Sequence, residues 1–138
     1  MERTLVFIKP DGIQKKIIGE IISRFEKKGL TLEKMQMVTL SKAQVDSHYQ
    51  EHLEKPFYPE LRDYILSSPI VAMVWSGSNA IAVVRKLIGA TNPSLAEPGT
   101  IRGDYALSLP FNLVHASDSV LSAEKEIKNI LLVFLMLL

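Results

Sequence analysis

The sequence predicts a mixed α/β fold, because short apolar runs typical of strands alternate with amphipathic stretches typical of helices. We expect four strands, at residues 4–8, 30–40, 70–75 and 113–114. Alternating strands and helices first suggest a parallel sheet. Four strands with two βαβ-like halves also fit a split βαβ, ferredoxin-like sandwich, so both architectures stay open at this point. We find no internal repeat and no domain boundary, and we therefore expect one domain over residues 1–138.

The helices are expected from periodic apolar positions and from their end signals. Ile21 and Phe25 belong to an amphipathic pattern that Gly29 ends as a helix C-cap. Ser41 and Gln44 form a capping-box pattern, which predicts a helix through about residue 52. Further helices are expected around residues 61–65, 78–88 and 122–129.

Residues 89–110 show no clear periodicity and hold three glycines and three prolines. A structureless loop of ~20 residues is unusual in a compact domain and tends to be functional when it occurs. We therefore expect binding residues in this segment, among them Arg102. The tripeptide Arg102-Gly103-Asp104 also matches a cell-adhesion motif, which we interpret as coincidental because the N-terminus does not resemble a secretory signal.

Composition narrows the class of function. The 16 Lys and Arg residues balance 15 Asp and Glu residues, which argues against a nucleic acid or an anionic membrane as the main partner. The absence of cysteine excludes disulfides, thiol catalysis and thiolate metal sites. Together with the N-terminus, these features lead us to expect a cytoplasmic protein.

Residues 130–138 form an unbroken apolar run. A membrane-spanning helix needs ~20 apolar residues, so a run of nine is too short. We expect this tail to pack on the core or on another subunit. The alternative is an exposed, aggregation-prone end.

The stretch over residues 112–119 carries the strongest candidate for chemistry. It places His115 at the end of a short apolar strand, before small and polar residues and the start of a helix. A histidine there can be a nucleophile or a general base, or it can be a structural residue at a strand end. Glu126 lies one turn into the helix after Ser122, where it could orient one ring nitrogen and leave the other free.

Any phosphate binding must depend on side chains, because the sequence contains neither a G-x-x-x-x-G-K-[ST] loop nor a G-x-G-x-x-G loop. Guanidinium groups grip phosphate oxygens bidentately, and lysine acts as a point charge. Taken singly, each candidate is more simply explained as a solvated surface residue. The candidates near strand ends and in the long loop are Lys9, Arg85, Thr91 and Arg102.

Two further features have ordinary alternatives. Phe57 follows Pro56 and is either a core residue or a platform for a flat ligand. The run from His48 to His52 matches the H-x-x-E-H zinc-peptidase pattern. We reject that match because no third zinc ligand is evident from the sequence.

Taken together, these residues resemble the nucleoside diphosphate kinase family over most of the chain, from Arg3 to about Ile127. The stretch at 112–119 is close to the family's signature, and so many matches in order leave little room for chance. The matching stretches are residues 8–12, 19–22, 24–26, 48–49, 55–57, 71–74, 89–93, 98–104 and 112–119.

The resemblance implies the family's ferredoxin-like α/β sandwich, an α+β fold with a four-stranded antiparallel sheet. It also implies ping-pong transfer of the γ-phosphate from a nucleoside triphosphate, typically ATP, to a nucleoside diphosphate. His115 would be the nucleophile and carry the phosphoryl group on one ring nitrogen. Glu126 would hold the other nitrogen, with Ser117 supporting it.

The resemblance also assigns binding residues. Lys9, Tyr49 and Asn112 would line the site, with Lys9 and Asn112 reaching the sugar hydroxyl and phosphate. Magnesium (Mg²⁺) would ride on the nucleotide phosphates, with at most a water-mediated link to Asp118. The residues expected on the phosphates are Arg85, Thr91 and Arg102, and those expected at the base are Phe57 and Leu61.

A homo-oligomer is implied as well, with a hexamer favoured and a tetramer or dimer as alternatives. Two positions depart from the family pattern: Phe111 stands where Arg is usual, and Ala116 where Gly is commoner. All carried-over site positions hold the expected residues, which favours an active enzyme over an idle binding or scaffold subunit. An RNA-binding module ranks lower, because the third strand offers only Trp75 as an aromatic and the net charge is +1.

Overall fold

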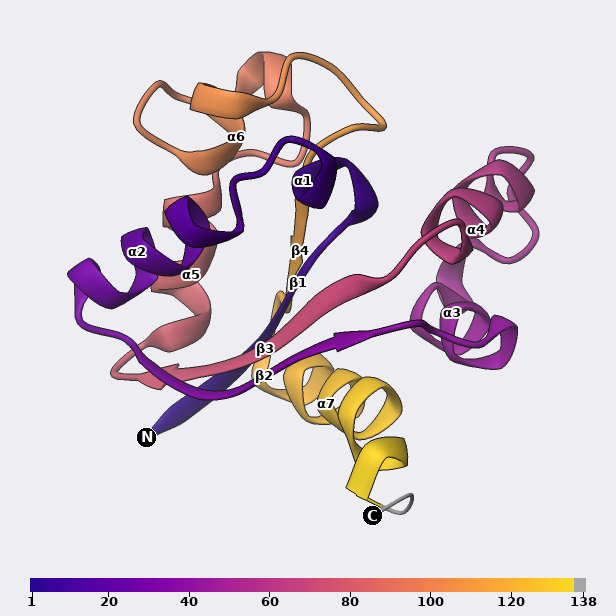
Figure 1. Ribbon diagram of the computed structural model, residues 1–138, viewed down its shortest axis with the longest axis horizontal. Helices are drawn as coiled ribbons and strands as arrows, with labels where there is room; N and C mark the ends of the chain where they lie inside the picture. The colour runs from indigo at the N-terminus through magenta and orange to yellow at the C-terminus, as the bar shows by residue number, and fades with distance from the viewer. Residues whose placement is uncertain (136–138) are drawn as a thin grey trace.

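A four-stranded antiparallel sheet forms the centre of the molecule (Figure 1). The computed structural model describes the fold of residues 1–135 and the side chains of residues 1–131. The strands are β1 (Glu2–Ile8), β2 (Thr31–Val38), β3 (Ile70–Gly77) and β4 (Val114–Ala116), in the spatial order β2-β3-β1-β4. All neighbouring strands pair antiparallel, so the parallel alternative is wrong and the ferredoxin-like sandwich is confirmed.

Helices cover both faces of this sheet (Figure 1). The α-helices are α1 (Pro10–Gln14), α2 (Ile18–Lys28), α3 (Lys42–His48), α4 (Tyr58–Leu66), α5 (Ala80–Ile88), α6 (Ile101–Tyr105) and α7 (Val120–Leu135). Two 3-10 turns complete the described chain: η1 (Gln50–His52) and η2 (Pro93–Leu95). None of the helices described is long and apolar enough to cross a membrane.

The two central strands are buried on both faces, which explains their nearly continuous apolar sequence. Successive side chains of β1 point to opposite faces. Val6 and Ile8 therefore join the core under α2 and α5, whereas Leu5 and Phe7 join the core under α3, α4 and α7.

The last helix is longer than expected, since it runs from Val120 to Leu135 rather than over 122–129. Ile130 and Leu131, the first residues of the apolar tail, are buried in the core shared with α3 and α4. Packing on the core is thus confirmed for these two residues. The remaining side chains of the tail lie outside the described residues.

The segment 89–110 is more ordered than the sequence suggests, because η2 and α6 lie within it. Both elements are too short to show a helical period, which needs a window of about 11 residues or more. Thr100 caps α6 by accepting a hydrogen bond from the Gly103 amide. Asn79 occupies the N-cap of α5, but its side chain makes no capping hydrogen bond.

The Arg-Gly-Asp tripeptide of α6 is part of the fold rather than an adhesion loop. Arg102 is buried, and Asp104 accepts hydrogen bonds from the Gly99 amide at 2.9 Å and from Arg24 at 2.7 Å. Gly103 packs so tightly on the main chain that a Cβ there would collide with the Glu97 carbonyl oxygen.

We expect Gly103→Ala to lower the free energy of unfolding by roughly 1–3 kcal/mol, because backbone rather than a flexible side chain blocks the added methyl group. Urea unfolding followed by the fluorescence of Trp75, the only tryptophan, measures the change. Gly19→Ala is the matched control, since a Cβ at Gly19 meets open space. It should be neutral or stabilising by up to about 1 kcal/mol. Equal stability of the two variants would contradict the tight packing at Gly103.

Candidate active site

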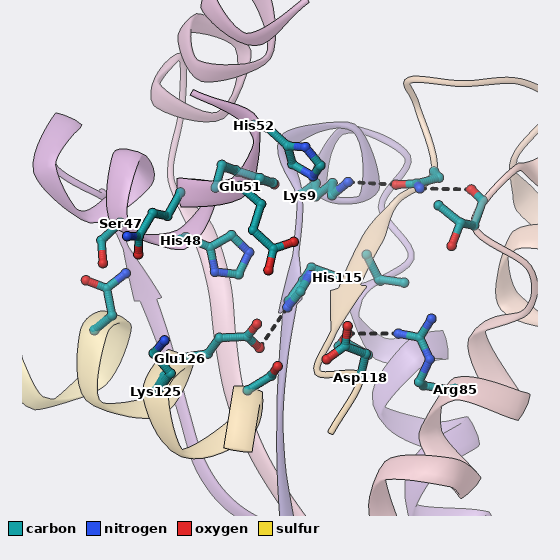
Figure 2. A pocket seen from close by; sticks show the side chains of 18 of the residues that line it. Lys9, Ser47, His48, Glu51, His52, Arg85, His115, Asp118, Lys125 and Glu126 are labelled. Atoms are coloured by element: carbon teal, nitrogen blue, oxygen red, sulfur yellow. Dashed lines mark hydrogen bonds and ion pairs between the residues drawn. The ribbon is translucent and has the colours of Figure 1, made fainter. Parts of the chain in front are cut away.

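A cavity of about 440 Å³ opens beside the end of β4, between α5, α7 and the segment from α3 to η1. Figure 2 shows its side chains converging from these separate elements. A second, more apolar cavity of about 650 Å³ adjoins it under α4. The two cavities share five lining residues: Lys9, Tyr49, His52, Thr91 and Asn112. The site therefore has a polar half and an apolar half.

His115 occupies the polar half, and β1 supports its ring. Strand pairing places His115 opposite Phe7, and the two rings stack with centroids 4.8 Å apart at 26°. The His115 side chain keeps 21% of its surface exposed. The ring is thus held against an apolar partner and still reached from the cavity.

A hydrogen-bond relay fixes which nitrogen of this ring is available. Nε2 of His115 lies 2.9 Å from Oε1 of Glu126 on α7, as drawn in Figure 2. The same oxygen accepts a hydrogen bond from the Ser117 hydroxyl at 2.7 Å. An ionised carboxylate only accepts, so Nε2 carries the proton. Nδ1, for which the described residues provide no hydrogen-bond partner, keeps its lone pair.

The main chain before His115 is strained and clamped. Leu113 has φ +75°, a left-handed conformation that costs a non-glycine residue of order 1–3 kcal/mol. Its amide donates to Asp11 at 2.9 Å, and its carbonyl accepts from the Lys9 amide at 2.8 Å. A Cβ on Gly12 would lie 2.8 Å from that same carbonyl oxygen. The Lys-Pro-Asp-Gly turn after β1 thus fits closely against the strand that presents the histidine.

Lys9 and Arg102 are buried cations rather than solvated surface charges, so the simpler explanation is wrong for both. Lys9 donates from Nζ to Asn112 Oδ1 at 2.7 Å, and the Asn112 amide donates to the Thr91 carbonyl at 3.0 Å. Burial, helped by the charge of Arg102, lowers the pKa of Lys9 to about 8.

Arg102 is held by main-chain oxygens instead of by an acid. Its guanidinium donates to the carbonyls of Asn112, Gly89 and Val114 at 3.1, 3.0 and 2.7 Å. Burial, with the nearby charge of Arg85, lowers its pKa to about 10. Arg85 itself donates to the Ala116 carbonyl at 3.1 Å. Within the described chain, Lys9, Arg85 and Arg102 have no carboxylate within 4 Å, so these three cations form no ion pair, although Glu51, Asp118 and Glu126 also line the cavity.

Two other predicted residues lie in the wall of the polar half. The Tyr49 hydroxyl is buried without a hydrogen-bond partner among the described residues, and burial raises the pKa of Tyr49. It therefore remains a protonated potential donor. Asp118 is exposed at the rim, where hydrogen bonding to Ser122 and the charge of Arg85 lower the pKa of its carboxyl.

The apolar half brings together the residues predicted for a base. Phe57 is 52% exposed and lies in the wall with Leu61, so the core interpretation of Phe57 is wrong. Sequence reasoning missed Leu109 as a wall residue, and it set Phe111 aside as a departure without a role. A consecutive run of large apolar residues within a polar loop was the available signal.

His48 was also missed as part of the site. It ends α3, and its ring meets the His115 ring edge-on at 4.4 Å and 84°. The zinc-peptidase pattern is not formed, because the His/Asp/Glu cluster found among the described residues contains His48 but neither Glu51 nor His52.

A buried cationic pocket around a partly exposed histidine, on a ferredoxin-like sandwich, defines the class: a protein built to bind phosphorylated ligands next to a nucleophile. Comparison with known proteins then narrows the class. A family model described as "Nucleoside diphosphate kinase" matches residues 2–133. The chain belongs to the nucleoside diphosphate kinase family.

Individual relatives agree with this assignment. A nucleoside diphosphate kinase of Halalkalibacterium halodurans is 57% identical over 92% of this chain and 86% of its own length. One of Archaeoglobus fulgidus is also 57% identical, over 92% of this chain and 84% of its own. The crystal structure of the Encephalitozoon cuniculi enzyme aligns with a TM-score of 0.92 at 46% identity, covering 95% of this chain and 89% of that one. The structure of a Halobacterium salinarum nucleoside diphosphate kinase in complex with CDP aligns with a TM-score of 0.91 at 44% identity, covering 94% of this chain and 86% of that one.

The buried charge of Lys9 predicts a pH-dependent stability. The pKa of Lys9 is about 8 in the folded protein, against its ordinary value of 10.5, so the unfolded chain binds more protons between these pH values. The free energy of unfolding of the wild type, relative to Lys9→Met, should therefore rise with pH across this window, by up to roughly 3 kcal/mol.

Urea titrations of both proteins at pH 7, 8, 9 and 10 measure this difference. The contributions of titrating groups that both proteins share cancel in it. The exposed Lys27→Met is the matched control for loss of a lysine charge. If the difference in unfolding free energy between wild type and Lys9→Met stays constant from pH 7 to 10, burial does not disfavour the charged form of Lys9.

Proposed function

We propose that this protein, as a single catalytic domain, is a nucleoside diphosphate kinase that works through a phosphohistidine on His115. The observation that carries the proposal is the Ser117–Glu126–His115 relay, which leaves Nδ1 as the nucleophile of a histidine that lines a cavity with Lys9, Arg85 and Arg102. The family assignment supports the same reaction, transfer of the γ-phosphate from ATP or another nucleoside triphosphate to a nucleoside diphosphate.

In the first half-reaction, the Nδ1 lone pair of His115 attacks the γ-phosphorus. The Nδ1–P bond forms, the bridging P–O bond breaks, and its electron pair leaves on the nucleoside diphosphate. The ring becomes a cation that keeps its Nε2 proton, and the carboxylate of Glu126 stabilises that charge through the hydrogen bond. In the second half-reaction, a terminal oxygen of the acceptor diphosphate attacks phosphorus, and the bonding pair returns to Nδ1.

The cations of the cavity hold the phosphates. Arg102 uses three of its five N–H donors in hydrogen bonds to the carbonyls, so two N–H groups remain for phosphate oxygens. Arg85 and Thr91 act beside it. Lys9 and Asn112, already hydrogen-bonded to each other, reach phosphate and sugar hydroxyl, and Tyr49 donates from its buried hydroxyl. Positioning and charge neutralisation of this kind supply most of the catalysis in phosphoryl transfer.

The base binds in the apolar half, stacked on Phe57 with Leu61 beside it. The cavity wall here is mainly aromatic and aliphatic, and stacking tolerates any base because every base has a π-face. We therefore propose broad tolerance of the base.

The residues present fit a magnesium ion that is carried mainly by the nucleotide. Mg²⁺ prefers oxygen ligands, keeps several waters and uses one or two carboxylates together with substrate phosphates. Asp118 offers one exposed, ionised carboxylate at the rim for contact through water. When bound, the metal neutralises phosphate charge and orients the phosphates.

Assembly and location complete the proposal. We propose a homo-oligomer, with a hexamer favoured over a tetramer or dimer. The exposed Met35 and Met37 on the edge strand β2 support burial against another subunit. We propose a cytoplasmic location, with neither a nucleic acid nor a membrane as the main partner, as the balanced charge suggests.

The histidine mechanism predicts a phosphoenzyme. With γ-labelled ATP, the wild type should form an acid-labile, base-stable phosphoprotein, and GDP should remove the label as GTP. His115→Ala should form none, whereas His52→Gln, which removes a histidine of the cavity wall that makes no contact in the relay, should still form the phosphoprotein. An unlabelled wild type would favour the idle scaffold instead, and undiminished label on His115→Ala would place the nucleophile elsewhere.

The stacking role predicts a separate defect for Phe57→Ala. Losing one aromatic platform costs about 1–3 kcal/mol of base binding, so nucleotide affinity should fall roughly 10-fold or more. The unfolding midpoint should change little, because Phe57 is half exposed. Leu107→Ala, at a more exposed position that lines neither cavity, is the control and should bind normally. Wild-type nucleotide affinity of folded Phe57→Ala would contradict the stacking role.

A further inference from the structure

His48 brings a third metal-ligating side chain to the nucleophile. One ligand atom each from His48, His115 and Glu126 lie within 4.8 Å of one another. Figure 2 shows His48 from α3 and Glu126 from α7 on the same side of the His115 ring. These three residues come from separate elements, so the fold rather than sequence proximity assembles the cluster.

His48 has the properties of an available ligand. Its Nδ1 is buried and has no hydrogen-bond partner among the described residues. A neutral imidazole with an uncommitted lone pair is the form that binds metals.

We propose that His48, His115 and Glu126 form an inhibitory site for a divalent transition metal, of which Zn²⁺ is the type. Two imidazoles and one carboxylate are a donor set typical of zinc sites, whose fourth position is left to water. Magnesium prefers oxygen donors, so it should not compete for a site in which two of three ligands are nitrogen.

The spacing is close to what the ion requires. Zinc holds nitrogen and oxygen ligands at about 2.0–2.2 Å, which puts two ligands of a tetrahedron about 3.3 Å apart. His115 Nε2 and Glu126 Oε1, at 2.9 Å, are already near that separation. His48 completes the cluster within 4.8 Å of this pair, so only its ring must move closer to reach the spacing of a bound ion.

Inhibition follows from the tautomer of His115, a step that rests on the proposed function. A neutral imidazole has one lone pair and one N–H. Catalysis needs the proton on Nε2, bound to Glu126, and the lone pair on Nδ1. A cation on Nε2 needs the lone pair there, which moves the proton to Nδ1 and leaves that atom unable to attack phosphorus. The cation also withdraws Glu126, so nucleophile and metal site exclude each other.

Zinc binding can be measured without any substrate. The chain has no cysteine and only three histidines, so competition against a chromogenic zinc chelator has little background. Wild type should bind one zinc ion, and His48→Gln should bind it at least about 10-fold more weakly, while His52→Gln should bind like the wild type. Absence of binding by the wild type, or equal binding by His48→Gln, overturns the site.

A measurement on the wild type alone guards against a variant that fails to fold. In NMR spectra, added zinc should shift the ring signals of His48 and His115 and leave those of His52 in place. Shifts confined to His52, or no shifts, overturn the proposal.

The inhibitory step is tested by phosphoenzyme formation at buffered free zinc and saturating magnesium. Zinc should suppress labelling of the wild type, and His48→Gln, compared with its own uninhibited label, should need at least about 10-fold more zinc. Equal sensitivity of the two proteins contradicts the tautomer argument. A wild type that takes no label even without zinc refutes the proposed function instead, and the binding and NMR results still decide the metal site.

Discussion

The antiparallel pairing of β1 with β4 is the constraint on which the site depends. It sets Phe7 beneath the His115 ring. One step further along, the Leu5 amide donates to the Ser117 hydroxyl, which in turn donates to Glu126. At the other end, the Lys9 amide holds the carbonyl of the strained Leu113. A central, fully buried strand thus supports the nucleophile, its relay and the turn before it, and a one-residue slip would disturb all three.

The cavity contains buried cationic side chains, which by themselves disfavour folding. Burial lowers the pKa of both Lys9 and Arg102, so each destabilises the empty protein in its charged form. Neutral carbonyls and an amide oxygen hold them instead of carboxylates, which leaves their charge available to an anion. Apolar cores on both faces of the sheet offset this cost. The left-handed main chain at Leu113 also lowers the stability of the folded state, and it too lies next to the catalytic histidine.

Local sequence patterns made part of the active site predictable. The strand–turn–helix pattern around His115 and the position of Glu126 near the start of the following helix indicate the pair, because both features are local. The burial of Arg102 is not local, since it depends on α6, which is too short to show a period, and on carbonyls from three other positions. The contact of His48 with His115 depends on how α3 packs against the sheet end. No spacing within the chain encodes that distance.

The departure at Phe111 shows how the same site tolerates a change at its edge. The Phe111 ring meets the Tyr64 ring edge-on at 5.6 Å, and the Tyr64 hydroxyl donates to Asp11. Asp11 accepts at the same time from the Leu113 amide. An apolar residue in place of the family's usual arginine therefore packs on the outside of the clamp that fixes the histidine strand. It adds aromatic surface to the apolar cavity and leaves the charges of the polar half unchanged, which is why a large change of side chain here is compatible with the reaction.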